Sequence, residues 1–249
     1  MKLTRCITII MFLLSCGAAS AQNDIKKTVL QELYQLQKRY SSEAGLSVDL
    51  KYTYSGESKP EVILDSLSGE IQFFGNGYRL KIEQTETIKN DKYAIVLFGE
   101  DSLMYISASK NTSSDPFSPT AMIDSSILNA EDARYAITNN ENLKYLIITY
   151  PDASPYKTIR FVIDKHTGLL VKSIMVLRTE FLTSTNGATV ELQGYEAYAI
   201  VETSFSNYKK ENKKDASIDE TLFFTRSGKE FIPTEKYRNY KIFIGTPNL

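Results

Sequence analysis

Apolar and polar residues alternate along most of this chain, and a spacing of two predicts β-strands with one buried and one solvated face. A representative stretch, LSGEIQFFGNGYRLKIEQTE, runs from Leu67 to Glu86, with apolar side chains at every second position on both sides of FGNG. Gly75-Asn76-Gly77 supplies the positive φ angles that a tight turn requires. The stretch therefore predicts a hairpin between two antiparallel strands.

The same alternation recurs further along the chain and predicts roughly nine to eleven strands. The expected strands are Leu46–Tyr54, Leu67–Phe73, Tyr78–Ile82, Tyr93–Phe98, Leu103–Ser107, Leu143–Tyr150, Thr158–Asp164, Leu169–Leu177, Glu191–Phe205, Thr221–Thr225 and Tyr240–Ile244. Alternation on nearly every strand indicates a single antiparallel sheet. Because large sheets twist, we expect a mainly β fold in which this sheet curves into an unclosed barrel.

Two segments depart from this alternation. Between Asp24 and Tyr40 the apolar residues recur at helical spacing, and Asn23-Asp24 offers an N-cap. This amphipathic helix is expected to cover the concave side of the sheet. From Asp115 to Asn140 two prolines and mixed charge interrupt the strand pattern, which predicts a long loop with one or two short helices.

Residues 1–21 are typical of a secretory signal peptide. Lys2 and Arg5 precede the apolar run Ile7–Leu14, and Ala19-Ser20-Ala21 follows it. The run is shorter than the roughly 20 residues that a membrane span needs. We therefore expect cleavage before Gln22, export to the periplasm, and a single domain over residues 22–249.

A second interpretation of the same segment gives a lipoprotein. Leu13-Leu14-Ser15-Cys16-Gly17 is similar to a lipobox, in which the chain is cut before a cysteine that then carries lipid. Cys16 would then anchor the protein in the outer membrane. Since the only two cysteines, Cys6 and Cys16, lie in this segment, the exported domain is expected to have no disulfide and no free thiol.

The remaining composition argues against several classes of function. The chain carries 29 basic and 30 acidic residues, so its charge favours no contact with nucleic acid. The single histidine, His166, falls in a predicted turn, and the chain contains no zinc-protease, nucleophile-elbow or phosphate-loop motif. We expect no metal, no cofactor, no catalytic residue and therefore no enzymatic activity.

Four stretches together resemble the LolA/LolB-like family of periplasmic lipoprotein carriers and their outer-membrane receptors: SGEIQFFGNGYRLKI, YAIVLFGEDSLMYIS, FVIDKHTGLLVKSIMV and TSFSNYKKEN. The resemblance covers most of the chain. Gly75-Asn76 replaces the Arg-Pro step of the family, and the chain has no tryptophan. The resemblance implies an unclosed barrel covered by helices, with an apolar cavity that receives the acyl chains of lipoproteins.

These observations predict a noncatalytic binding or carrier protein for lipid or lipoprotein acyl chains, with a role in outer-membrane lipoprotein sorting. Membrane-associated envelope proteins are further expected partners. The candidate lining residues of the cavity are Tyr78, Leu80, Ile82, Val96, Phe98, Leu103 and Tyr105. The alternative is a structural or protein-interaction component of the cell envelope, in which the same residues fill the core and Asp115–Asn140 is the docking surface.

Overall fold

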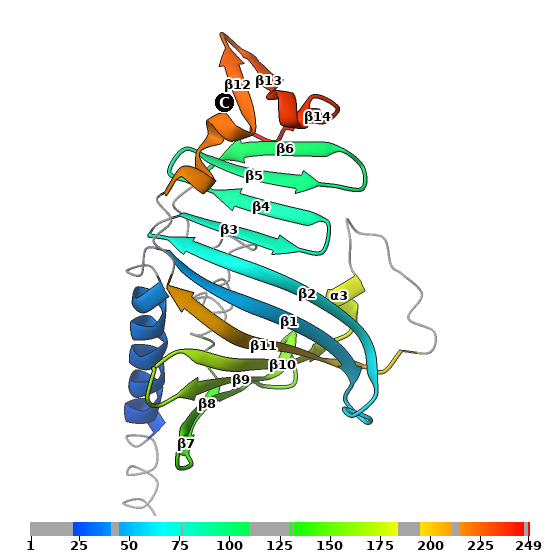
Figure 1. Ribbon diagram of the computed structural model, residues 1–249. Coiled ribbons are helices and arrows are strands. Elements are labelled where there is room, and N and C mark those ends of the chain that lie inside the picture. The colour runs from blue at the N-terminus through cyan, green and yellow to red at the C-terminus, as the bar shows by residue number, and fades with distance from the viewer. Residues whose placement is uncertain are drawn as a thin grey trace, which may run out of the picture.

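A computed structural model of the protein describes residues 22–40, 45–75, 77–109, 130, 132–183, 195–210, 215–246 and 249 (Figure 1). Its main feature is a sheet of twelve strands in the order β14-β6-β5-β4-β3-β2-β1-β11-β10-β9-β8-β7. All neighbours are antiparallel except β14 and β6, which run parallel. The curved sheet ends at β14 and β7, so these described strands leave it unclosed, as the sequence predicted.

The strands of this sheet are β1 (Leu46–Gly56), β2 (Ile63–Phe74), β3 (Gly77–Ile82), β4 (Thr85–Lys89), β5 (Tyr93–Phe98), β6 (Leu103–Ala108), β7 (Arg134–Asn139), β8 (Leu143–Thr149), β9 (Tyr156–Asp164), β10 (Leu170–Arg178), β11 (Tyr198–Lys210) and β14 (Lys241–Ile244). A separate hairpin joins β12 (Phe224–Ser227) to β13 (Glu230–Pro233). The short helical elements are α3 (Glu180–Thr183), η2 (Asp215–Ile218), η3 (Glu220–Leu222) and η4 (Glu235–Tyr237).

One face of the sheet, which we call the inner face, carries Val48, Ile71 and Leu80 side by side on β1, β2 and β3. Residues 22–40 are helical and pack their apolar side on this face. The helix contributes Val29, Leu33, Leu36 and Tyr40 to a core that continues through strands β1 to β3 and β7 to β10. Figure 1 shows the helix at one end of the strands, beside β8 to β11.

The opposite, outer face is also apolar on β4, β5 and β6. Ile88, Ile95 and Ile106 lie opposite one another there and are fully buried. The segment from η2 to η4 covers them with Ile218, Phe223, Phe224 and Tyr237. This second core explains why Ala94-Ile95-Val96-Leu97 is apolar at consecutive positions, since both faces of β5 are buried.

Most of the predicted elements are present. The FGNG turn joins β2 to β3 with Phe74 opposite Gly77, and Gly75 has a φ of 66°. The turn between β9 and β10 has Gly168 at a φ of 68°. The predicted helix is also present, but Asn23 and Asp24 are already helical, since the described helix begins at residue 22. The N-cap prediction at Asn23-Asp24 was therefore wrong.

Two further predictions about strands need correction. The strand predicted at Thr221–Thr225 begins only at Phe224, in β12, because η3 forms at Glu220–Leu222, where the Asp219 side chain accepts from the Thr221 amide. Strands β4, β7 and β13 were not predicted, and β7 occupies part of the predicted loop Asp115–Asn140. Residues 110–129, with the predicted short helices, lie outside the described residues, as do residues 1–21 with Cys16. Within the described part of the chain, no helix combines the length and apolar character of a membrane span.

Candidate functional site

All seven predicted lining residues lie on the inner face. One row of cross-strand neighbours on β3 to β6 consists of Leu80, Thr87, Val96 and Tyr105. Ile82, Phe98 and Leu103 share the next row through Thr85. Tyr78 precedes Leu80 by two positions and therefore points to the same side. The period of two in the sequence therefore corresponds to a shared face in the structure.

Exposure divides these residues into two groups. Tyr78, Leu80 and Val96 are buried, with 5%, 7% and 7% of their surface accessible. Tyr78 and Leu80 belong to the core beneath the helix, so their role is packing. Ile82 and Leu103 are half-buried. Phe98 and Tyr105 are exposed, so four of the seven residues are accessible from the inner side of the sheet.

Sequence reasoning missed three further members of this accessible surface. Tyr52 and Phe205 are half-buried at the border of the core. Phe243 lies opposite Tyr105 on the parallel strand β14 and is 51% exposed. We call the combined surface the inner band; it consists of Tyr52, Ile82, Phe98, Leu103, Tyr105, Phe205 and Phe243. No signal in the sequence places Phe243 there, because periodicity does not reveal that β14 pairs with β6.

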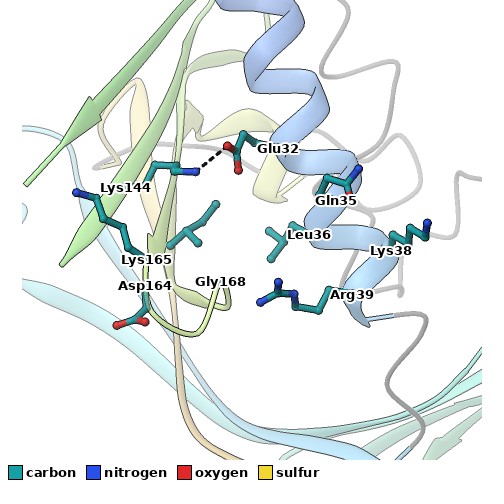
Figure 2. A pocket seen from close by; sticks show the side chains of 10 residues that line it. Glu32, Gln35, Leu36, Lys38, Arg39, Lys144, Asp164, Lys165 and Gly168 are labelled. Atoms are coloured by element: carbon teal, nitrogen blue, oxygen red, sulfur yellow. Dashed lines mark hydrogen bonds and ion pairs between the residues drawn. The ribbon is translucent and has the colours of Figure 1, made fainter.

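A separate pocket of about 530 Å³ lies between the helix and the β9–β10 turn (Figure 2). Lys144 Nζ bonds Glu32 Oε1 at 2.7 Å on one side, and the Arg39 guanidinium contacts the Thr167 carbonyl on the other. Leu36 points into the space from the helix (Figure 2). None of the seven predicted lining residues borders this pocket.

Several charged groups around this pocket have partners within the protein. Asp164 accepts from the Thr167 amide at 2.7 Å, from the Thr167 hydroxyl at 3.0 Å and from the His166 amide at 2.9 Å. These hydrogen bonds, led by those from Thr167, lower the pKa of the Asp164 carboxyl. Glu32 is likewise paired with Lys144. The pocket is therefore a polar junction that ties the helix to the sheet, and it offers little to an apolar ligand.

The described residues show little that resembles a catalytic centre. They contain no group of three or more His, Cys, Asp and Glu side chains placed to hold a metal ion. His166 lies in the β9–β10 turn, where its backbone amide donates to Asp164. The inner band itself contains no charged side chain. Its chemistry is therefore limited to apolar contact and to the hydroxyl groups of Tyr52 and Tyr105.

No protein-family model matches the chain, and no curated protein sequence matches it. Among solved structures, the chain is similar to an uncharacterized conserved protein from Thermus thermophilus, with a TM-score of 0.46, 8% identity, and coverage of 88% of this chain and 98% of that one. It is similar to a LolA superfamily protein from Nitrosomonas europaea, with a TM-score of 0.35, 10% identity, and coverage of 78% and 97%. For the MucA/MucB complex of Pseudomonas aeruginosa the TM-score is 0.42 at 12% identity, with coverage of 83% of this chain and 63% of that one.

Proposed function

We propose that this protein is a noncatalytic binding or carrier protein of the cell envelope, and that its inner band binds acyl chains of lipids or lipoproteins. The observation that carries this proposal is the exposure of three aromatic side chains on the inner face. Phe98, Tyr105 and Phe243 are 39%, 42% and 51% exposed, on the same face that is buried elsewhere beneath the helix.

Acyl chains suit this surface for a physical reason. They bind by removing apolar area from water, at roughly 25 cal/mol per Å², and need no directional partners. The band is continuous with the buried core, so a chain lying along it would extend the apolar surface that is already buried beneath the helix. Clustered exposed apolar side chains on one face mark interaction surfaces, whereas isolated ones are common on any protein.

Location in the envelope is part of the same proposal. Residues 1–21 would direct export, and residues 22–249 would form the single mature domain. If the bound acyl chains belong to lipoproteins, the protein would take part in outer-membrane lipoprotein sorting. Cleavage before Cys16 would instead give an outer-membrane lipoprotein. Mass spectrometry of the mature N-terminus distinguishes a chain that begins at Gln22 from one that begins at a lipidated Cys16.

The binding proposal is tested with purified mature protein and a fluorescent fatty acid, together with mass spectrometry of copurified lipid. Wild type is expected to bind the probe, and the double variant Phe98→Ser with Phe243→Ser to bind it at least several-fold more weakly. Phe181→Ser is the matched control, because Phe181 is 53% exposed on α3, outside the inner band.

Two results would count against acyl-chain binding. One is wild-type protein that neither binds the probe nor copurifies with lipid. The other is a double variant that binds as well as Phe181→Ser. Either result favours the alternative function, a structural or protein-interaction component of the envelope with a filled interior.

A further inference from the structure

A strip of three hydroxyl-bearing side chains crosses the inner face on strands β1, β11 and β10. Tyr52 on β1 lies opposite Thr203 on β11, and Thr203 lies opposite Ser173 on β10. The same row continues through Phe161 on β9 to Leu146 on β8, both fully buried. We call Tyr52, Thr203 and Ser173 the hydroxyl strip.

Thr203 is the unusual member of the strip. It has no accessible surface, and among the described residues its Oγ1 has no hydrogen-bond partner. Burying an unpaired hydroxyl is unfavourable, and valine has nearly the same shape without that cost. A side chain selected only for packing at this position would therefore be apolar. The hydroxyl group needs another explanation.

The strip adjoins the inner band. The next row across the inner face begins with Phe205 opposite Leu50 and Leu50 opposite Gly69. It continues through Ile82 and Thr85 to Phe98 and Leu103. Tyr52 belongs to both surfaces, so a chain that lies along the band reaches the strip at its β1 end.

The surroundings of the strip favour an uncharged ligand group. The charged side chains next to it in sequence are Lys51, Lys172 and Glu202. All three point to the outer face, where Lys172 and Glu202 bond each other at 2.6 Å. Burial raises the pKa of the Tyr52 hydroxyl to about 12, so that group is a neutral phenol at physiological pH. A carboxylate or phosphate would be poorly compensated here, whereas a carbonyl oxygen needs only one donor.

We propose that the Thr203 hydroxyl donates a hydrogen bond to the ester carbonyl oxygen of an acyl lipid whose chains lie on the inner band. This inference rests on the proposed function. In a lipid, the ester carbonyls lie between the hydrocarbon chains and the polar headgroup. With the chains on the inner band, the carbonyls would lie where the band meets the hydroxyl strip. Because Thr203 is fully buried, the ester group must displace the side chains that cover it.

The test compares two lipids that differ only in the carbonyl group: a diester phosphatidylglycerol and its diether analogue. Wild type is expected to bind the diester about tenfold more tightly, the effect of one hydrogen bond of typical strength. Thr203→Val should bind the two lipids equally, and Thr203→Ser should keep the preference. Thr149→Val, at an exposed position of β8, is the control and should behave as wild type.

The outcomes separate the two proposals. Equal affinity of wild type for both lipids overturns the role of Thr203 but leaves acyl-chain binding in place, as does a Thr203→Val variant that still prefers the diester. Binding of neither lipid overturns both. Ligand-free Thr203→Val should also unfold at or above the wild-type temperature. Marked destabilisation would mean that the hydroxyl has a partner within the protein, which would contradict the proposal.

Discussion

Tyr40 Oη lies 2.7 Å from Tyr208 Oη, and this contact joins the end of the N-terminal helix to β11. The Tyr208 hydroxyl donates to the Leu170 carbonyl at 2.8 Å, and the Leu170 amide donates to Tyr40 Oη at 3.3 Å. Because each hydroxyl has one proton, the Tyr40 hydroxyl donates to Tyr208. The three residues form a closed ring of hydrogen bonds that fixes the helix on the inner face.

Replacing Tyr208 by phenylalanine should destabilise the protein by about 1–3 kcal/mol, because the Leu170 carbonyl and the Tyr40 hydroxyl both lose a partner in a largely buried place. The free energy of unfolding in urea measures the effect. Tyr34→Phe on the same helix is the control, since Tyr34 is 61% exposed. Equal stability of the two variants would show that the ring contributes nothing.

Stability should decline in alkaline solution as buried tyrosines lose their protons. Burial raises the pKa of Tyr52 to about 12 and also raises the pKa of Tyr40, whereas an unfolded chain has tyrosine pKa values near 10. Above pH 10 the unfolded state therefore holds fewer protons than the folded state, and the free energy of unfolding falls with pH. Below pH 10 this contribution is fully present.

Tyr52→Phe should make that decline shallower between pH 10 and about pH 12, because one group with a raised pKa is removed. Urea unfolding curves at several pH values measure the slope. Tyr34→Phe, with its exposed ring, should keep the wild-type slope. An unchanged slope in Tyr52→Phe would contradict the assignment of part of the decline to Tyr52.

Phe223→Ala should cost about 3–5 kcal/mol, because Phe223 is 1% exposed within the cover of the outer face and its removal leaves a cavity. The adjacent Leu222 is 47% exposed, so Leu222→Ala should change stability by less than about 1 kcal/mol. Chemical denaturation compares the two variants. Similar small losses in both would mean that the segment from η2 to η4 packs only loosely on the sheet.

Gly168→Ala should destabilise more than Gly228→Ala, although both glycines have positive φ angles of 68° and 62°. The left-handed backbone costs an alanine about 1 kcal/mol at either site. At Gly168 an added Cβ would also lie 2.3 Å from Arg39 Nη1, whereas nothing lies within 4 Å at Gly228. Thermal unfolding of the two variants measures the contribution of the contact between the turn and the helix. Equal losses of stability in the two variants would show that this contact contributes nothing.

The strands that sequence reasoning found and missed differ in their pattern. β3 was found because Tyr78, Leu80 and Ile82 alternate with polar residues. β4 was missed because Thr87 takes the inner position and only Ile88 is apolar. Tyr135 and Ile137 do alternate in β7, but they follow a stretch with prolines and mixed charge. A polar inner position thus concealed β4, whereas the prolines and mixed charge of the preceding stretch concealed β7.

The sequence predicted which face of the sheet carries the candidate residues, but not which of them are accessible. A period of two placed Leu80 and Tyr105 on one face, and the structure confirms this. It did not indicate that Leu80 is buried and Tyr105 exposed, because the helix that covers part of this face is distant in sequence. Thr203 was also overlooked, since a threonine in a strand gives no sign of lacking a partner.

The outer cover of β4 to β6 has a consequence for how the chain matures. The outer side of these strands is apolar, and the residues that shield it follow far later in the polypeptide. While the chain is being made, the apolar outer side of β4 to β6 therefore stays exposed to solvent until the segment from η2 to η4 has been synthesised. The final packing of this part of the sheet is thus postponed until the C-terminal segment has been made.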